Sequence, residues 1–119
     1  MKAKSINLKV VKEEINGVPT VLTTHALLRM AVNSPEQGGY DIDEMMKRLR
    51  LLEKIDAFKD KFTIKDEKQE PSDEFLATEA TLELEDSDFE KLKSLFTKMK
   101  WGVLCNYIIE LNEELKQAQ

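Results

Sequence analysis

The sequence predicts an α+β domain in which a small antiparallel sheet packs against about four helices. Apolar and polar residues alternate at the start of the chain and again near residues 78–85, as in half-buried strands. Three- and four-residue apolar spacing fills much of the remainder, as in amphipathic helices. A chain of 119 residues is enough for one domain, which we assign to residues 1–119.

The first strand and its partner form an N-terminal hairpin. Alternation begins at Ser5 and is followed by Asn16-Gly17, a pair that suits a type I′ turn because both positions need positive φ. Pro19 in the second arm cannot donate to a strand ladder, so that arm belongs at an edge. If the third strand, 78–85, pairs with the first, its glutamates lie opposite Lys9 and Lys12.

The longest helix is predicted over residues 41–62. Asp41 and Glu44 have the spacing of a capping box at its start. Its apolar stripe is predicted to face the core and comprises Ile42, Met45, Met46, Leu49, Leu52, Ile55, Phe58 and Phe62. A short buried helix, capped by Thr23 or Thr24, precedes it. A loop with one proline and two glycines, 34–39, joins the two helices.

Two further helices follow the third strand. Ser87 and Glu90 have capping-box spacing, and Gly102 marks a break before the last helix, 103–116. The stripe of that last helix is Leu104, Tyr107, Ile108, Leu111 and Leu115. Met30, Met45, Met46 and Met99 suit either an adaptable binding groove or, the interpretation we prefer, an irregular core.

The net charge of -5 comes from the second half of the chain. Between Asp66 and Glu90 there are 11 acidic residues opposed only by Lys68. This balance argues against direct nucleic-acid binding, which needs Lys and Arg for the phosphates. It suits a basic protein partner, or simply a solvated acidic face. Around it, residues 63–76 form a predicted flexible acidic excursion.

The candidate partner-binding residues come from this sector and from one aromatic corner. The acidic candidates are Asp66, Glu67, Glu70, Asp73 and Glu74. Trp101 is the other candidate, because tryptophan is enriched in binding hot spots. A large core residue at a helix corner is the competing interpretation of Trp101.

The chemical motifs of enzymes and metal sites are not recognisable in the sequence. His25 has no companion histidine or cysteine at ligand spacing, and we interpret it as a structural or capping residue. Cys105 is the single cysteine, so it forms no intrachain disulfide, and a buried structural thiol is its preferred interpretation. We therefore expect no catalytic residue, metal or cofactor.

The chain carries no signal-peptide pattern at its start and no apolar run long enough to span a bilayer. The lone cysteine fits a reducing compartment. We therefore expect a cytoplasmic protein that does not bind membranes.

Two segments carry a resemblance to a known group of proteins. One is DEMMKRLRLLEKI, 43–55, preceded by the ING turn, an apolar helix and a Pro/Gly loop; the other is LELEDSDFEKLKSLF, 82–96. Together they resemble small accessory proteins encoded by tailed phages and prophages. The resemblance implies a mobile-element origin and a binding role, and transfers no functional residue.

These observations lead to three functional hypotheses. The first is a non-enzymatic accessory protein that binds a host or phage protein, as an acidic inhibitor or modulator. The second is a particle-assembly protein that acts as a homo-oligomer, through the long helix or the last helix. The third is an enzyme with an unrecognised site.

Overall fold

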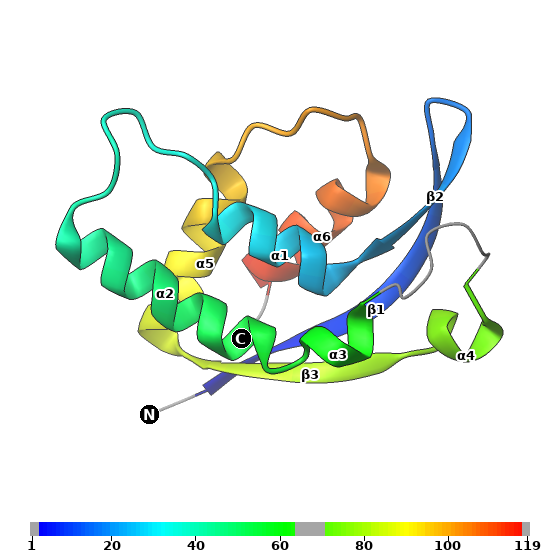
Figure 1. Cartoon of the computed structure of the whole chain (residues 1–119), viewed down its shortest axis with the longest axis horizontal. Helices are drawn as coiled ribbons and strands as arrows, with labels where there is room; N and C mark the ends of the chain where they lie inside the picture. Colours follow the sequence, from blue (N-terminus) through cyan, green and yellow to red (C-terminus); the bar gives the residue numbers. More distant parts are fainter. Residues whose placement is uncertain (1–2, 64–70, 118–119) are drawn as a thin grey trace.

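The computed structural model describes residues 3–63 and 71–117 and shows an α+β fold (Figure 1). The elements are β1 (Ala3–Ile15), β2 (Val18–Thr23), α1 (Thr24–Val32), α2 (Ile42–Asp56), α3 (Lys59–Phe62), α4 (Asp73–Leu76), β3 (Glu79–Glu85), α5 (Asp86–Lys98) and α6 (Asn106–Gln117). The three strands form an antiparallel sheet in the order β2-β1-β3. The predicted fold class is therefore confirmed.

The long strand β1 pairs with its two neighbours along different parts of its length. Its residues 3–9 pair with β3 and its residues 10–15 pair with β2. Asn16 and Gly17 have φ values of 53° and 80°, which confirms the predicted turn. Lys9 lies opposite Glu79 as predicted, but Lys12 lies opposite Val21, because the pairing with β3 ends at Lys9.

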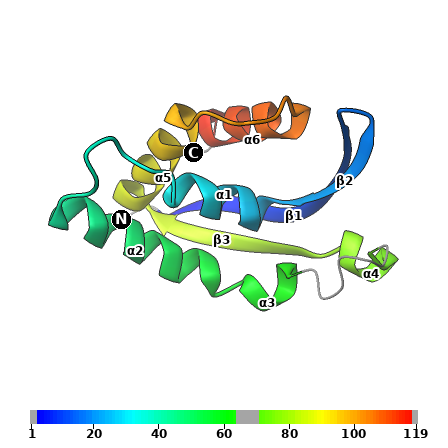
Figure 2. The same ribbon diagram turned by 45° about the horizontal axis from the view of Figure 1, so that its top comes forward.

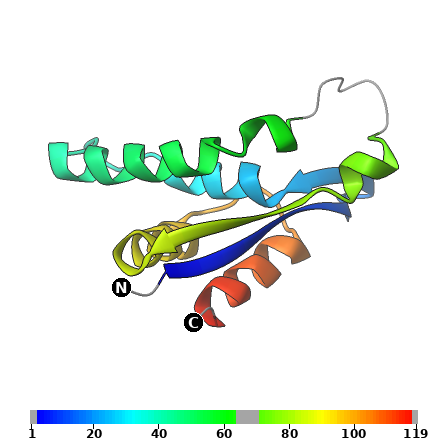
Figure 3. The ribbon, with the colours of Figure 1, turned by 90° about the horizontal axis from the view of Figure 1, so that it is seen from below.

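One face of the sheet is covered and the other is open. Ile6 and Leu82 point inward and are buried, whereas their neighbours Ser5, Asn7 and Glu83 are exposed. In Figures 2 and 3, α2 and α3 lie beside β3, whereas α6 lies beyond β1, away from β3. Side chains of all three helices join the same buried cluster as the inward side chains of the sheet. Antiparallel sheets commonly have one solvated face, so these exposed polar residues need no partner.

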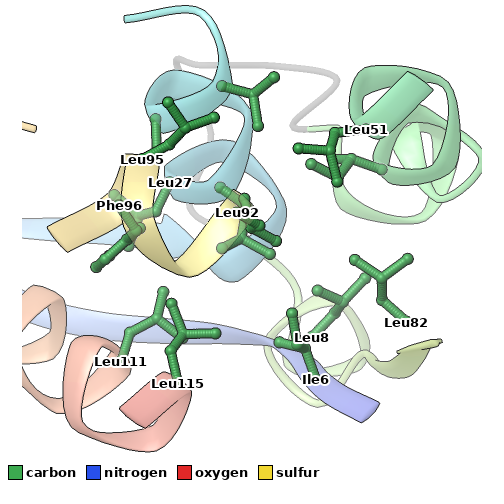
Figure 4. Close-up of a cluster of buried hydrophobic side chains, with 14 of the residues drawn as sticks. Ile6, Leu8, Leu27, Leu51, Leu82, Leu92, Leu95, Phe96, Leu111 and Leu115 are labelled. Atoms are coloured by element: carbon green, nitrogen blue, oxygen red, sulfur yellow. The ribbon is translucent and has the colours of Figure 1, made fainter. Parts of the chain in front are cut away.

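A single cluster of buried side chains joins the sheet to the four longer helices. Figure 4 shows Leu51 pointing from α2 toward the side of the cluster that holds Leu92. Other members of the cluster are Ile6, Leu8, Leu27, Leu82, Leu95, Phe96, Leu111 and Leu115.

The predicted long helix is divided in two. α2 is the longest helix, but it ends at Asp56, and a separate turn of helix, α3, begins at Lys59. The predicted cap is confirmed, since the Asp41 side chain accepts a hydrogen bond from the Glu44 amide at 2.7 Å. The break falls at Ala57-Phe58, where no glycine or proline signals it in the sequence.

Three other boundaries differ from the sequence predictions. α5 begins at Asp86 with Glu85 as its N-cap, so Ser87 lies inside the helix and the predicted capping box is wrong. α6 begins at Asn106, and Leu104 is 92% exposed instead of lying on its buried stripe. The described end of the excursion, 71–76, contains the helical turn α4, so that part is not structureless.

The start of α6 is held by a carboxylate from β1. Glu13 accepts a hydrogen bond from the Tyr107 amide at 3.1 Å and one from the Cys105 thiol at 2.7 Å. A negative charge at a helix N-terminus is favourable. Cys105 is buried there, as predicted, and burial together with the bond to Glu13 raises the pKa of its thiol. The Tyr107 hydroxyl meets the Thr24 hydroxyl at 2.5 Å and ties α6 to α1.

Arg48 joins α1, the following loop and α2. It is only 4% exposed. Its Nη1 donates to the carbonyl oxygens of Val32 and Ser34, at 3.0 and 2.7 Å. Its Nη2 donates to Glu36 at 2.6 Å, and its Nε donates to Glu44 at 2.8 Å. A buried cation is tolerated only when it is paired and hydrogen-bonded in this way.

We predict that Arg48→Met lowers the free energy of unfolding by about 3 kcal/mol, because it leaves buried acceptors without a donor. Urea unfolding followed by circular dichroism measures the change. Arg29→Met is the matched control: its ion pair with Asp56 is partly exposed, so the expected loss is under about 1 kcal/mol. Equal losses in the two variants would contradict a special role for Arg48.

Candidate functional site

The structure describes only part of the acidic sector predicted from sequence. Asp66, Glu67 and Glu70 lie outside the described residues. Asp73 and Glu74 form the exposed first turn of α4. Among the described acids of the sector, Asp88 is buried, and the rest are exposed: Asp73, Glu74, Glu79, Glu83, Glu85, Asp86 and Glu90.

Trp101 lies apart from α4. The connection between α5 and α6 that carries it runs along the opposite edge of the molecule from α4 (Figure 1). Its ring is half-buried and packs on Phe96, with centroids 5.0 Å apart and an interplanar angle of 53°. This contact favours the core interpretation of Trp101 over a binding hot spot.

Asp88 is the acid of the sector that lies in the interior. It is buried at the start of α5 and accepts hydrogen bonds from Arg50 at 2.6 and 3.0 Å and from Lys54 at 3.0 Å. Burial by itself raises the pKa of a carboxyl, but these hydrogen bonds outweigh it and the pKa of Asp88 lies below its usual range. Asp88 therefore fixes one side of α2 against α5.

Glu44 makes a second connection between α2 and α5. Its carboxylate accepts hydrogen bonds from Lys91 of α5 and from Arg48 of α2. Those two hydrogen bonds lower the pKa of Glu44. Together with Asp88, Glu44 sets the rotation of α2 about its own axis.

With α2 in this orientation, the side of the helix that faces the interior carries one charged residue and two apolar residues. The buried residues of α2 are Arg48, Leu51 and Ile55. They follow one another at three- and four-residue spacing, so they share one side of the helix. Leu51 is nine residues from Ile42, or two and a half turns, and so lies on the opposite side.

The predicted core stripe is half right: Ile55 and Phe62 lie in the core and Leu52 and Phe58 pack against it, whereas its first four residues point outward. Ile42, Met45, Met46 and Leu49 are between 42% and 71% exposed, and these four residues define the outer face of α2. Met30 on α1 is also 50% exposed. The prediction that these residues fill the core is wrong for all five, while Met99 packs against the core as predicted.

The sequence contained a signal that the stripe prediction missed. Seven apolar residues between Ile42 and Ile55 are too many for one stripe, and Leu51 and Ile55 lie on the side of the helix opposite Ile42 and Leu49. Two apolar faces were therefore implied. Which face turned inward depended on the distant partners of Arg48 and Asp88.

The outer face is flanked by charged side chains. Asp43 and Lys47 form an ion pair at 3.0 Å on the helix surface. Arg50 is 54% exposed although it bonds to Asp88. An exposed apolar centre with a polar rim is the usual composition of a protein-binding surface.

His25 is buried and structural in its surroundings. It stacks on Phe62 with centroids 6.2 Å apart, and its Nε2 lies 3.4 Å from an Asp56 oxygen without forming a hydrogen bond. Burial lowers the pKa of His25, and the nearby Asp56 carboxylate offsets only part of this effect. His25 thus packs α1 against α2 and α3 as a neutral side chain.

A cavity of about 460 Å³ lies between the loop that precedes α2 and the end of α5. Its lining includes Ser34, Glu36, Leu95, Lys98 and Lys100. Glu36 is already held by Arg48. The Ser34 hydroxyl in this lining donates a hydrogen bond to the Ala31 carbonyl at 2.7 Å.

Within residues 3–63 and 71–117, no group of three or more His, Cys, Asp or Glu side chains is placed to hold a metal ion. No helix among those residues is long and apolar enough to cross a membrane. Comparisons with protein-family models, curated proteins and solved structures find no match to this chain. The exposed apolar residues of the outer face of α2 make it the candidate site.

We predict that stability falls as the pH drops below about 6.5, because of His25. Its pKa is lowered in the folded state, so the unfolded chain binds the proton first as pH drops through 6.5. Stability is thus present above that pH and is lost as pH falls through the folded-state pKa. Urea unfolding across this range measures the loss.

His25→Gln should flatten the pH dependence in that window. The lowered pKa values of Glu44 and Asp88 act in a separate, more acidic window, because their stabilising effect is lost only below their usual pKa values near 4. The variant should keep that acidic loss. An unchanged slope above pH 5 in His25→Gln would show that His25 is not the titrating group.

Proposed function

We propose that this protein acts by binding another polypeptide through the outer face of α2, and not by catalysis. The observation that carries the proposal is the exposure of Ile42, Met45, Met46 and Leu49 on one helix. They are neighbours, since residues three and four apart are adjacent on a helix surface. Monomeric soluble proteins rarely expose contiguous apolar patches larger than a few hundred Å² without a binding role.

The exposure of this face does not arise from a shortage of core residues. The opposite side of α2 already supplies Leu51 and Ile55 to the core, and both are completely buried. Truncating the outer face should therefore cost little stability, whereas burying it in a complex gains roughly 25 cal/mol per Å². A small loss of stability on truncation, together with a gain of free energy on binding, distinguishes a binding surface from a packing surface.

The composition of the face suits an adaptable contact. Two of its four residues are methionines, whose flexible and polarisable side chains fit partner surfaces of different shapes. An amphipathic helix face of this kind packs against a groove or a second helix. The acidic-inhibitor and phage-accessory hypotheses remain predictions from sequence, and the proposal does not depend on them.

Site-specific photo-crosslinking tests the proposal. A photoreactive amino acid replacing Met46 should form covalent adducts with a polypeptide in cells that express the protein, visible as a defined band of higher mass. The matched control is the same amino acid replacing Ile109 on α6, since Met46 is 65% exposed and Ile109 is 63% exposed. We expect adducts from position 46 at several times the yield from position 109.

Two outcomes contradict the proposal. One is the absence of adducts from position 46, and the other is equal yield from the two positions. Leu49→Lys adds an independent check, because a charge on the outer face should reduce adduct yield at position 46 while leaving the urea midpoint nearly unchanged.

A further inference from the structure

We propose that the partner of the outer face is a second copy of this chain, with the two α2 helices packed antiparallel across a two-fold axis. This inference rests on the proposed function, because it assigns the occupant of the same face. Closed two-fold dimers are the commonest soluble homo-oligomers, and they require a self-complementary surface.

The charges along α2 make the face self-complementary only in the antiparallel direction. The first turn is acidic, with exposed Asp41 and Asp43. The next turns present basic Lys47 and Arg50, which are also exposed. Glu53, four residues after Leu49, is exposed on the same side, and with a crossing between Met46 and Lys47 it lies level with residue 40, just before the first turn of the other helix. In an antiparallel pair the acidic end of each helix meets the basic stretch of the other, whereas a parallel pair sets like charges side by side.

Asp43 and Arg50 give the pairing a definite register. Seven residues apart, they lie almost directly above one another on the same side of the helix. If the two helices cross between Met46 and Lys47, Asp43 of each copy lies level with Arg50 of the other. Because of the two-fold symmetry, this ion pair forms twice in the dimer.

The same register packs the apolar residues of the two copies against one another. Met46 lies beside the axis and meets Met46 of the second copy. Ile42 of each copy lies toward Leu49 of the other. The opposed helix dipoles also favour the antiparallel arrangement.

The outer face is flanked by both acidic and basic side chains, and this favours a second copy over an unrelated partner. A strongly basic or strongly acidic partner would meet a like-charged stretch at one end of α2. The area argues for a reversible dimer, since α2 has 15 residues, or a length of about 22 Å. The area of one helix face of that length is smaller than the roughly 800 Å² that each partner buries in a stable interface of standard size.

Disulfide trapping tests both the partner and the direction. In a Cys105→Ser background, Met46→Cys should form an intermolecular disulfide under mild oxidation, because its two copies lie beside the axis. Ile42→Cys should not form a disulfide, since its two copies lie about 13 Å apart along the direction of the helices. A disulfide needs Cα atoms within about 7 Å of each other. Crosslinking of both variants would overturn the antiparallel arrangement.

Sedimentation equilibrium of the unmodified protein supplies the solution measurement. The average mass should rise from 13.7 kDa toward twice that value with increasing concentration. Asp43→Lys should reduce the dimer fraction several-fold, because it faces Arg50 of the second copy. Asp60→Lys, the same change on exposed α3, should leave the dimer fraction unchanged.

A mass of 13.7 kDa at every concentration, with no disulfide from Met46→Cys, would overturn the dimer. The proposed function fails separately. Photo-crosslinks from position 46 to a different polypeptide would preserve it while excluding self-association, and no adduct of any kind would exclude both.

Discussion

The buried guanidinium of Arg48 is the interaction on which the arrangement of this protein depends. It links the end of α1, the following loop and α2 through hydrogen bonds to Val32, Ser34, Glu36 and Glu44. A cation placed in the interior is costly unless every donor finds an acceptor. The network therefore allows one rotation of α2, the rotation that keeps Arg48 inside, and Glu44 and Asp88 fix the same rotation from α5.

Because of this constraint, a helix with two apolar faces leaves one of them exposed. The inner face, with Leu51 and Ile55, completes the core, while the outer face is left exposed. The charges that orient the helix also form the rim of the exposed face, since Arg50 contacts Asp88 and remains 54% exposed. One helix thus combines packing on its inside with proposed recognition on its outside.

Much of the fold was predictable because it follows local rules. Asn16-Gly17 set the turn, Asp41 capped α2, and alternation located β3. The candidate site was not predictable, because apolar spacing identifies a stripe but not its direction. The direction depends on contacts such as Arg50 with Asp88, which are 38 residues apart. The start of α6 likewise depends on Glu13, 94 residues before Tyr107, so the sequence placed Leu104 wrongly in that helix.

Residue-by-residue methionine oxidation tests the central claim most directly. Peroxide treatment followed by peptide mass spectrometry compares Met46 and Met30, which are 65% and 50% exposed, with Met99, which packs against the core. In dilute protein the account predicts fast oxidation of Met46 and Met30 and slow oxidation of Met99. At high concentration Met46 should become protected while Met30 stays reactive. Oxidation of Met46 as slow as that of Met99 in dilute protein would contradict the account, because the outer face of α2 would then lie in the core.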